Sequence, residues 1–115
     1  MARAGRPRSR TYNRAMNNKI KVVVDKDLED LIPVFLKNRQ KEVQALKAAA
    51  AAADFEQLRQ LGHRMKGVGN SYGFEQVSVY GRQIEEGARS GDRAALDACI
   101  ASYSDYLSRV DVSYE

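Results

Sequence analysis

Apolar residues spaced three and four apart recur in several long segments, and this periodicity most limits how the chain can fold. Between residues 55 and 72 they form one stripe along a helix: Phe55, Leu58, Leu61, Met65, Gly69 and Tyr72. Such a stripe predicts an amphipathic helix with one buried side. Three other segments carry a similar spacing. We therefore expect an all-α fold, an antiparallel up-and-down four-helix bundle with a short extra N-terminal helix or a kinked first helix.

The first helix is expected to begin near Asp25 or Asp27, whose side chains can accept hydrogen bonds from free N–H groups at a helix start. Its expected buried side consists of Leu28, Leu31, Ile32, Phe35, Leu36, Val43 and Leu46. Pro33 lacks an N–H group and clashes with the preceding turn. It predicts either a kink or a short helix that ends near Ile32, followed by a longer one. The alanines at 48–53 prolong that helix at little cost.

The second helix is expected from Asp54, which forms a capping-box pattern with Gln57, to about Tyr72. The third is expected over residues 74–90, and the fourth from the Gly-Asp pair at 91–92 to about residue 110. The stripe of the fourth is Ala95, Leu96, Cys99, Ile100, Tyr103, Leu107 and Val110. The β-prone run at 20–24 has no evident second strand, so we expect an extended segment that packs on the helices.

Length and composition exclude several classes of protein. At 115 residues the chain is expected to be one domain. There is no apolar run of the roughly 18 residues that a membrane span needs, and no signal-peptide pattern, so we expect a cytoplasmic protein with no membrane partner. The single cysteine, Cys99, lies on a buried stripe and is expected in the core. One histidine and one cysteine make no metal-ligand cluster, and no metal site is expected.

The net charge of +4 is unevenly distributed along the chain. Residues 1–21 contain seven basic residues and no acidic one, which leaves twelve basic and fifteen acidic residues in the remainder. The high isoelectric point therefore belongs to one segment. We expect a basic, disordered arm at residues 1–19, a helical bundle at 20–112 and a tail at 113–115.

His63 is the only histidine, and it lies roughly 155° around the helix from the middle of the apolar stripe. This phase argues against a core histidine and leaves either an incidental surface residue or a reactive one. Gly67, one turn later, leaves no side chain over the ring although glycine costs about 1 kcal/mol in a helix. Lys66 can reach towards a group attached to the ring. This pattern favours a nucleophile that receives a phosphoryl group.

These residues resemble the signature of a known family. His63-x-x-Lys66-Gly67, followed by Gly73 and Phe74, is similar to the motif of histidine phosphotransfer (HPt) domains, four-helix modules of multistep two-component phosphorelays. The resemblance covers residues 20–112. In two positions the sequence departs from the family pattern: Val68 stands where Ser or Ala is frequent, and Glu85 where glutamine is common.

The resemblance implies that His63 relays a phosphoryl group between receiver-domain aspartates. It implies that Lys66 offsets the charge of that group, that Gly67 lets the partner approach, and that Glu85 accepts a hydrogen bond from the ring. Candidate partner contacts are Arg59, Arg64, Asn70 and Arg89. The implied partners are response-regulator receiver domains and a hybrid histidine kinase, with Mg²⁺ bound by the receiver and no cofactor bound by this chain. We expect a monomer.

The sequence contains no phosphate-binding loop and no kinase motif set, so we expect a phosphoryl-relay intermediate without kinase activity of its own. Two other functions stay open. One is a non-catalytic helical adaptor that binds receiver domains or other proteins. The other is a small nucleic-acid binder that uses the basic arm, against which the acidic remainder of the chain counts.

Overall fold

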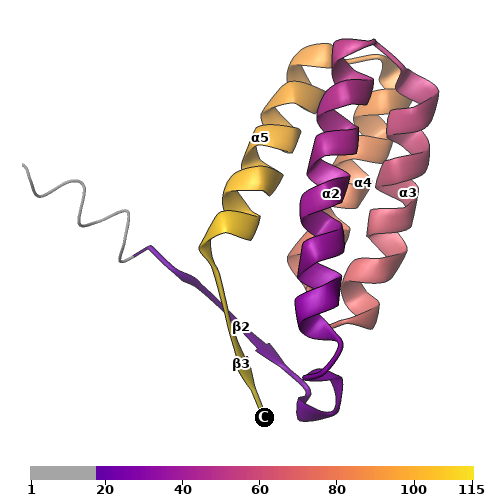
Figure 1. The fold of residues 1–115 in the computed structure, drawn as a ribbon. Coiled ribbons are helices and arrows are strands. Elements are labelled where there is room, and N and C mark those ends of the chain that lie inside the picture. Colours follow the sequence, from indigo (N-terminus) through magenta and orange to yellow (C-terminus); the bar gives the residue numbers. More distant parts are fainter. Residues whose placement is uncertain (1–17) are drawn as a thin grey trace, which may run out of the picture.

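The computed structural model describes residues 18–115, so the arm expected at 1–19 lies outside it except for its last two residues. The described chain is mostly helical, as expected, and its four helices lie side by side (Figure 1). In chain order the elements are β2 (Ile20–Val24), the 3₁₀-helix η2 (Lys26–Leu28), α2 (Ile32–Ala51), α3 (Phe55–Ser71), α4 (Glu75–Ser90), α5 (Arg93–Arg109) and β3 (Val110–Tyr114).

The start of α2 follows one of the two expected forms. A short helix, η2, precedes the long one, although it ends at Leu28 rather than near Ile32. Pro33 lies in the first turn of α2, where a missing N–H group costs no helical hydrogen bond. Asp25 caps η2 rather than α2, since its carboxylate accepts from the Asp27 N–H at 2.8 Å. Leu31, expected to be buried, is 50% exposed because it precedes α2 as its N-cap.

The expectation that residues 20–24 have no partner strand is wrong. Strand β2 pairs in parallel with β3, in a register that runs from Ile20 opposite Val110 to Val24 opposite Tyr114. Helix α5 ends at Arg109, and the residues placed in a helix end and a tail form β3 instead. The signal was the alternation of apolar and polar residues in Val-Asp-Val-Ser-Tyr, which is too short to identify a strand without its partner.

The core lies between the helices and the inner face of the two strands. Its fully buried side chains are Tyr103, Phe74, Ile32, Leu46, Leu58, Met65, Ile84, Leu96, Val24, Val43 and Val77. The Tyr103 hydroxyl donates a 2.9 Å hydrogen bond to Glu42 of α2 and so ties α5 to α2. Cys99 is half-buried, and burial raises the pKa of its thiol to about 11, which keeps it protonated at neutral pH.

Helices α3 and α4 approach so closely that their backbones meet. A Cβ atom added to Gly81 would lie 2.5 Å from the backbone nitrogen of Lys66, and one added to Gly62 would lie 2.7 Å from the backbone nitrogen of Glu85. Real Cβ atoms essentially never come so near a backbone atom. Glycine at these two positions therefore permits the contact, and the contact carries Glu85 of α4 to the side of α3 that bears His63.

Candidate functional site

His63 projects from the middle of α3 into solvent, with 66% of its side chain exposed. The apolar stripe of the same helix points the other way, since Leu58 and Met65 are completely buried. The exposure predicted from the helical phase is therefore confirmed. An accessible imidazole at this position can meet a partner without any rearrangement of the core.

Glu85 holds the ring from the neighbouring helix. The Nδ1 atom of His63 lies 3.1 Å from Oε2 of Glu85, whose side chain is only 4% exposed. Lys66 donates a 2.8 Å hydrogen bond from Nζ to Oε1 of the same carboxylate, and Arg89 approaches Oε2 at 3.4 Å. The buried carboxylate of Glu85 thus contacts the imidazole of His63, the ammonium of Lys66 and the guanidinium of Arg89.

These contacts keep Glu85 ionised. The hydrogen bond from Lys66 is the largest cause of a lowered pKa at Glu85; burial opposes it, and the hydrogen bond with His63 adds to it. An ionised carboxylate has no proton to give and can only accept. Nδ1 of His63 must therefore carry the hydrogen of this bond, and in the neutral ring Nε2 keeps its lone pair. That tautomer is the one a nucleophilic Nε2 requires.

The surface beside the ring is open at Gly67. A Cβ atom added there would have no neighbouring atom within 4 Å. The ammonium of Lys66 binds Glu85 in this structure, and the Lys66 side chain is 42% exposed. A partial exposure of this kind still leaves part of the ammonium accessible to an incoming anion.

The four candidate partner contacts are not all in one place. Arg89 joins the carboxylate that holds His63. Arg59 is engaged one turn back on α3, where it forms an ion pair with Glu56 at 2.7 Å. Arg64 and Asn70 are exposed on α3. The Asn70 backbone N–H donates to Oγ of Ser78 at 2.9 Å, so that residue also helps to join α3 to α4.

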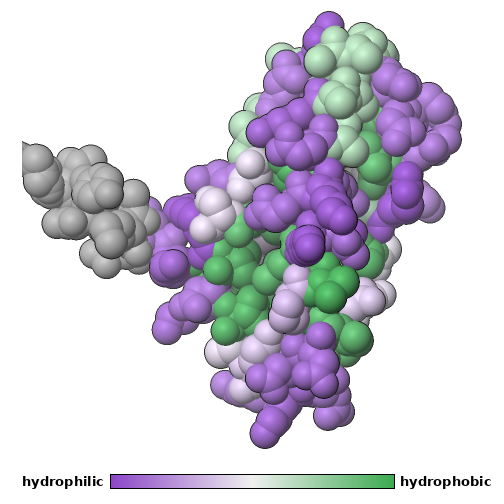
Figure 2. Space-filling model, viewed as in Figure 1, coloured by the Kyte–Doolittle hydropathy of each residue, from purple (hydrophilic) through white to green (hydrophobic). Residues whose placement is uncertain are grey.

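An apolar hollow between α2 and α3 was not assigned from the sequence. It has a volume of about 210 Å³ and is lined by Leu31, Val34, Phe35, Asn38, Arg39, Val68 and Tyr72. Val34 is 62% exposed, and the Phe35 and Tyr72 rings stack with their centroids 4.6 Å apart. Apolar side chains reach the surface on the face seen in Figure 2. The sequence signal for this hollow was Val34, an apolar residue that lies outside the buried stripe of its helix.

Residues 18–115 have neither a metal-binding cluster nor a membrane-spanning helix. That part of the chain contains no group of three or more His, Cys, Asp or Glu side chains placed to hold a metal ion. Within the same range, no helix combines the length and apolar character needed to cross a membrane.

A comparison with known protein families matches most of the described chain. A family model described as Hpt domain matches residues 30–112, which is well over half of the chain. Comparison with curated proteins and with solved structures gave no significant match. The matched range includes α3 and α4 and therefore every residue of the cluster around His63.

Proposed function

The chain belongs to the Hpt domain family, which acts in phosphorelay signalling, and on that premise we propose that His63 is its phosphoryl acceptor. In this proposal His63 takes a phosphoryl group from a receiver-domain aspartate and passes it to another, within two-component signal transduction. The observation that carries the proposal is an exposed imidazole whose Nδ1 is held by a buried, ionised Glu85. The proposal takes the four helices as an antiparallel up-and-down bundle, whose short connections fix α3 against α4.

The chemical step needs little from this chain beyond a positioned ring. The Nε2 lone pair forms a bond to phosphorus while the bond between phosphorus and the aspartate oxygen breaks, and the aspartate leaves as a carboxylate. The Nδ1 proton stays in its hydrogen bond with Glu85, which stabilises the positive charge that develops on the ring. The return step reverses these bond changes. The receiver supplies the Mg²⁺ ion, and this chain adds no cofactor.

Lys66 and Gly67 have complementary roles in the proposal. The ammonium of Lys66 offsets part of the roughly −2 charge of the transferred group, an exposed interaction worth about 1 kcal/mol or less. Gly67 leaves the backbone bare, so the receiver can bring its aspartate close to the ring. Glu85 is a positioning residue, because it acts on the phosphoryl group only through His63 and Lys66.

The receiver is proposed to dock over the apolar hollow as well as the histidine. Val68 lies about 7 Å beyond His63 along the axis of α3, and Tyr72, the C-cap of that helix, lines the same hollow from the side that bears the apolar stripe. With Leu31 and Val34 they offer apolar contact area, and exposed apolar patches of this kind mark interaction surfaces. Arg64 and Asn70, exposed on the same helix, are proposed to contact the polar rim of the receiver.

The direct test is transfer of label from phosphorylated receiver domains. The chain should gain phosphate that is stable in base and labile in acid, and His63→Gln should abolish it while the helical circular dichroism stays unchanged. Gln44→Ala changes an exposed glutamine on α2, away from His63 and the hollow, and is the control that should be labelled at the normal rate. Label that persists in His63→Gln would exclude His63 as the acceptor. Absence of label from every receiver alongside tight receiver binding would select the adaptor function.

Gly67→Gln tests the role of open backbone. Since no atom lies within 4 Å of a Cβ at this position, the substitution should leave the fold intact. Transfer should nevertheless fall by at least about 100-fold, because a long side chain beside the ring holds the reacting atoms apart. Single-turnover transfer rates measure this directly. A rate equal to that of the unchanged chain would remove the steric argument.

A further inference from the structure

We propose that two copies of this chain associate through the outer edge of β2, with the two β2 strands antiparallel about a two-fold axis at Val23. This replaces the expectation of a monomer, and it does not depend on the proposed phosphoryl transfer. The argument rests on the backbone groups of β2, on its side-chain pattern and on the order of charges along it.

The backbone of β2 has one paired edge and one open edge. The Val24 carbonyl accepts from Glu115 N at 3.0 Å, and Lys26 N donates to the Glu115 carbonyl at 3.0 Å. In a parallel pair the strand turns alternate residues towards its neighbour, so Lys21 and Val23 direct their N–H and C=O groups away from β3. Within residues 18–115 the sheet has only the strands β2 and β3, and no turn or loop backbone group bonds to that edge of Lys21 or Val23.

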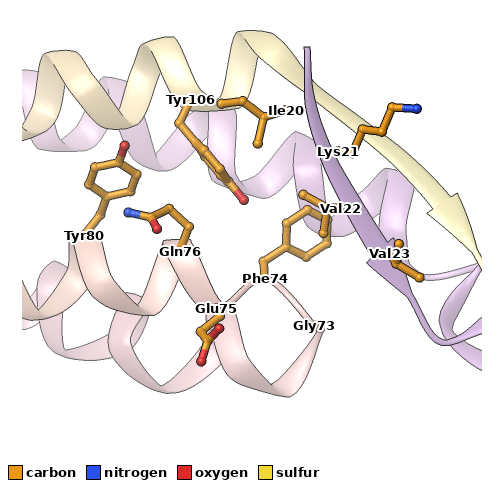
Figure 3. A pocket seen from close by; sticks show the side chains of 10 residues that line it. All are labelled: Ile20, Lys21, Val22, Val23, Gly73, Phe74, Glu75, Gln76, Tyr80 and Tyr106. Atoms are coloured by element: carbon orange, nitrogen blue, oxygen red, sulfur yellow. The ribbon is translucent and has the colours of Figure 1, made fainter. Parts of the chain in front are cut away.

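The side chains on the outer face of β2 are also available. Ile20 and Val22 turn towards Tyr106 and Phe74, whereas Lys21 and Val23 turn away from the helices (Figure 3). Val23 is 55% exposed although it lies in a run of three valines. A hollow of about 450 Å³ separates this stretch of β2 from the start of α4. An exposed, β-prone edge with unpaired donors and acceptors is a template for another strand.

The charges around Val23 identify the second strand as another copy of β2. Lysines stand two and four positions before Val23, and aspartates stand two and four positions after it, in Lys19-Ile-Lys-Val-Val-Val-Asp-Lys-Asp27. These four charged residues, and Lys26 between the two aspartates, are all exposed. Reversing the direction of this segment exchanges Lys19 with Asp27 and Lys21 with Asp25, and sets the remaining lysine, Lys26, opposite Ile20. The segment is therefore electrostatically complementary to itself only in the antiparallel orientation.

The exposed Val23 side chains, together with the charges, select one register. With Val23 opposite Val23, Lys21 of each copy faces Asp25 of the other. The backbone groups of Lys21 point outwards, whereas the Asp25 carbonyl already accepts from Leu28 N at 2.9 Å, so Lys21 and Asp25 pair through their side chains. The two exposed valines then cover each other. A shift of two residues one way sets Lys21 opposite Val23, and a shift the other way sets Val23 opposite Asp25. The first alternative keeps Lys19 opposite Asp25 and the second keeps Lys21 opposite Asp27, but both lose the contact between the two exposed Val23 side chains.

Sedimentation velocity on the full chain tests the proposal, from about 1 μM to about 1 mM, where a small interface should dissociate. The mass should rise from 12.9 kDa towards twice that value. Lys21→Glu and Asp25→Lys should each weaken association about tenfold or more, because each sets like charges opposite one another twice. An equimolar mixture of the two variants should associate again, since each glutamate or aspartate of one then faces a lysine of the other.

A matched control distinguishes the effect of charges at the β2 edge from a general effect of charge on association. Lys47→Glu makes the same charge change on the exposed face of α2 and should associate like the unchanged chain. Circular dichroism should be the same for all four proteins. A mass of 12.9 kDa at every concentration overturns the proposal, because the outer edge of β2 then does not bind a second copy. So does a dimer that both charge reversals leave intact, or a mixture of the two variants that stays monomeric.

Discussion

At the scale of single residues, Glu85 combines two properties that usually exclude each other, burial and charge. Its side chain is 4% exposed, yet it stays ionised because Lys66, His63 and Arg89 surround it. The helical phase of α3 was enough to predict an exposed His63. The sequence could only suggest Glu85 by family resemblance, and it could not show that Lys66 binds Glu85, because that contact depends on the separation of two helices.

The charge of Glu85 should be visible in the pH dependence of stability. Its pKa is lower in the folded chain than in the unfolded one, so its contribution is present above about pH 4.3 and is lost as pH falls through the folded-state value. Glu85→Gln should lose about 1 kcal/mol of unfolding free energy at pH 7, and the difference from the unchanged chain should narrow below about pH 4.

Urea denaturation at several pH values measures this difference. Glu86→Gln changes the adjacent, exposed acid on the same helix and is the control, for which no such pH-dependent difference is expected. A constant gap between Glu85→Gln and the unchanged chain down to about pH 3 would show that the carboxylate gains nothing from its partners on folding.

At the scale of elements, the contact between α3 and α4 depends on glycines that look costly in the sequence. Gly62 and Gly81 have backbone atoms where a Cβ would lie, whereas Gly67 has open space. Sequence periodicity could not separate a glycine needed for close packing from one that leaves a surface bare. The role of each glycine depends on how close the neighbouring helix lies, and a single helix does not reveal that distance. The close approach of α3 and α4 in turn determines where the cluster around His63 forms.

Two alanine substitutions should therefore have opposite effects on stability. Gly81→Ala would place a Cβ 2.5 Å from the backbone nitrogen of Lys66 and so force α3 and α4 apart. This substitution should lower the unfolding free energy by about 1–3 kcal/mol or more. Gly67→Ala meets nothing and should raise it by about 0.5–1 kcal/mol through helix propensity. Urea denaturation of both variants provides the measurement. Equal effects of the two would contradict the close contact.

At the scale of the whole molecule, β2 and β3 join segments from the two ends of the described chain. The four helices could be predicted because each long segment carries its own periodicity. The strand pair could not, because neither five-residue segment identifies the other across the intervening helices. The same pairing explains why Val24 is 1% exposed, although it lies outside every helix.

Removal of β3 should therefore destabilise the whole fold. A chain that ends at Arg109 loses the half-buried Val110, Val112 and Tyr114 and uncovers β2, which should cost about 2–4 kcal/mol of unfolding free energy. The midpoint of urea denaturation should fall accordingly. Ser113→Ala changes an exposed residue of the same strand and should stay within about 0.5 kcal/mol of the unchanged chain. An unchanged midpoint in the shortened chain would mean that β3 contributes no packing.

The parallel direction of β2 and β3 also determines how the molecule bears mechanical load. The strands are in register, with Ile20 at the start of one and Tyr114 at the end of the other. Tension applied between those two residues pulls the strands past each other along their length. Every hydrogen bond of the ladder is then loaded at once, so the sheet must shear as a unit rather than open one bond at a time. The helices between the strands are shielded from that tension until the ladder breaks.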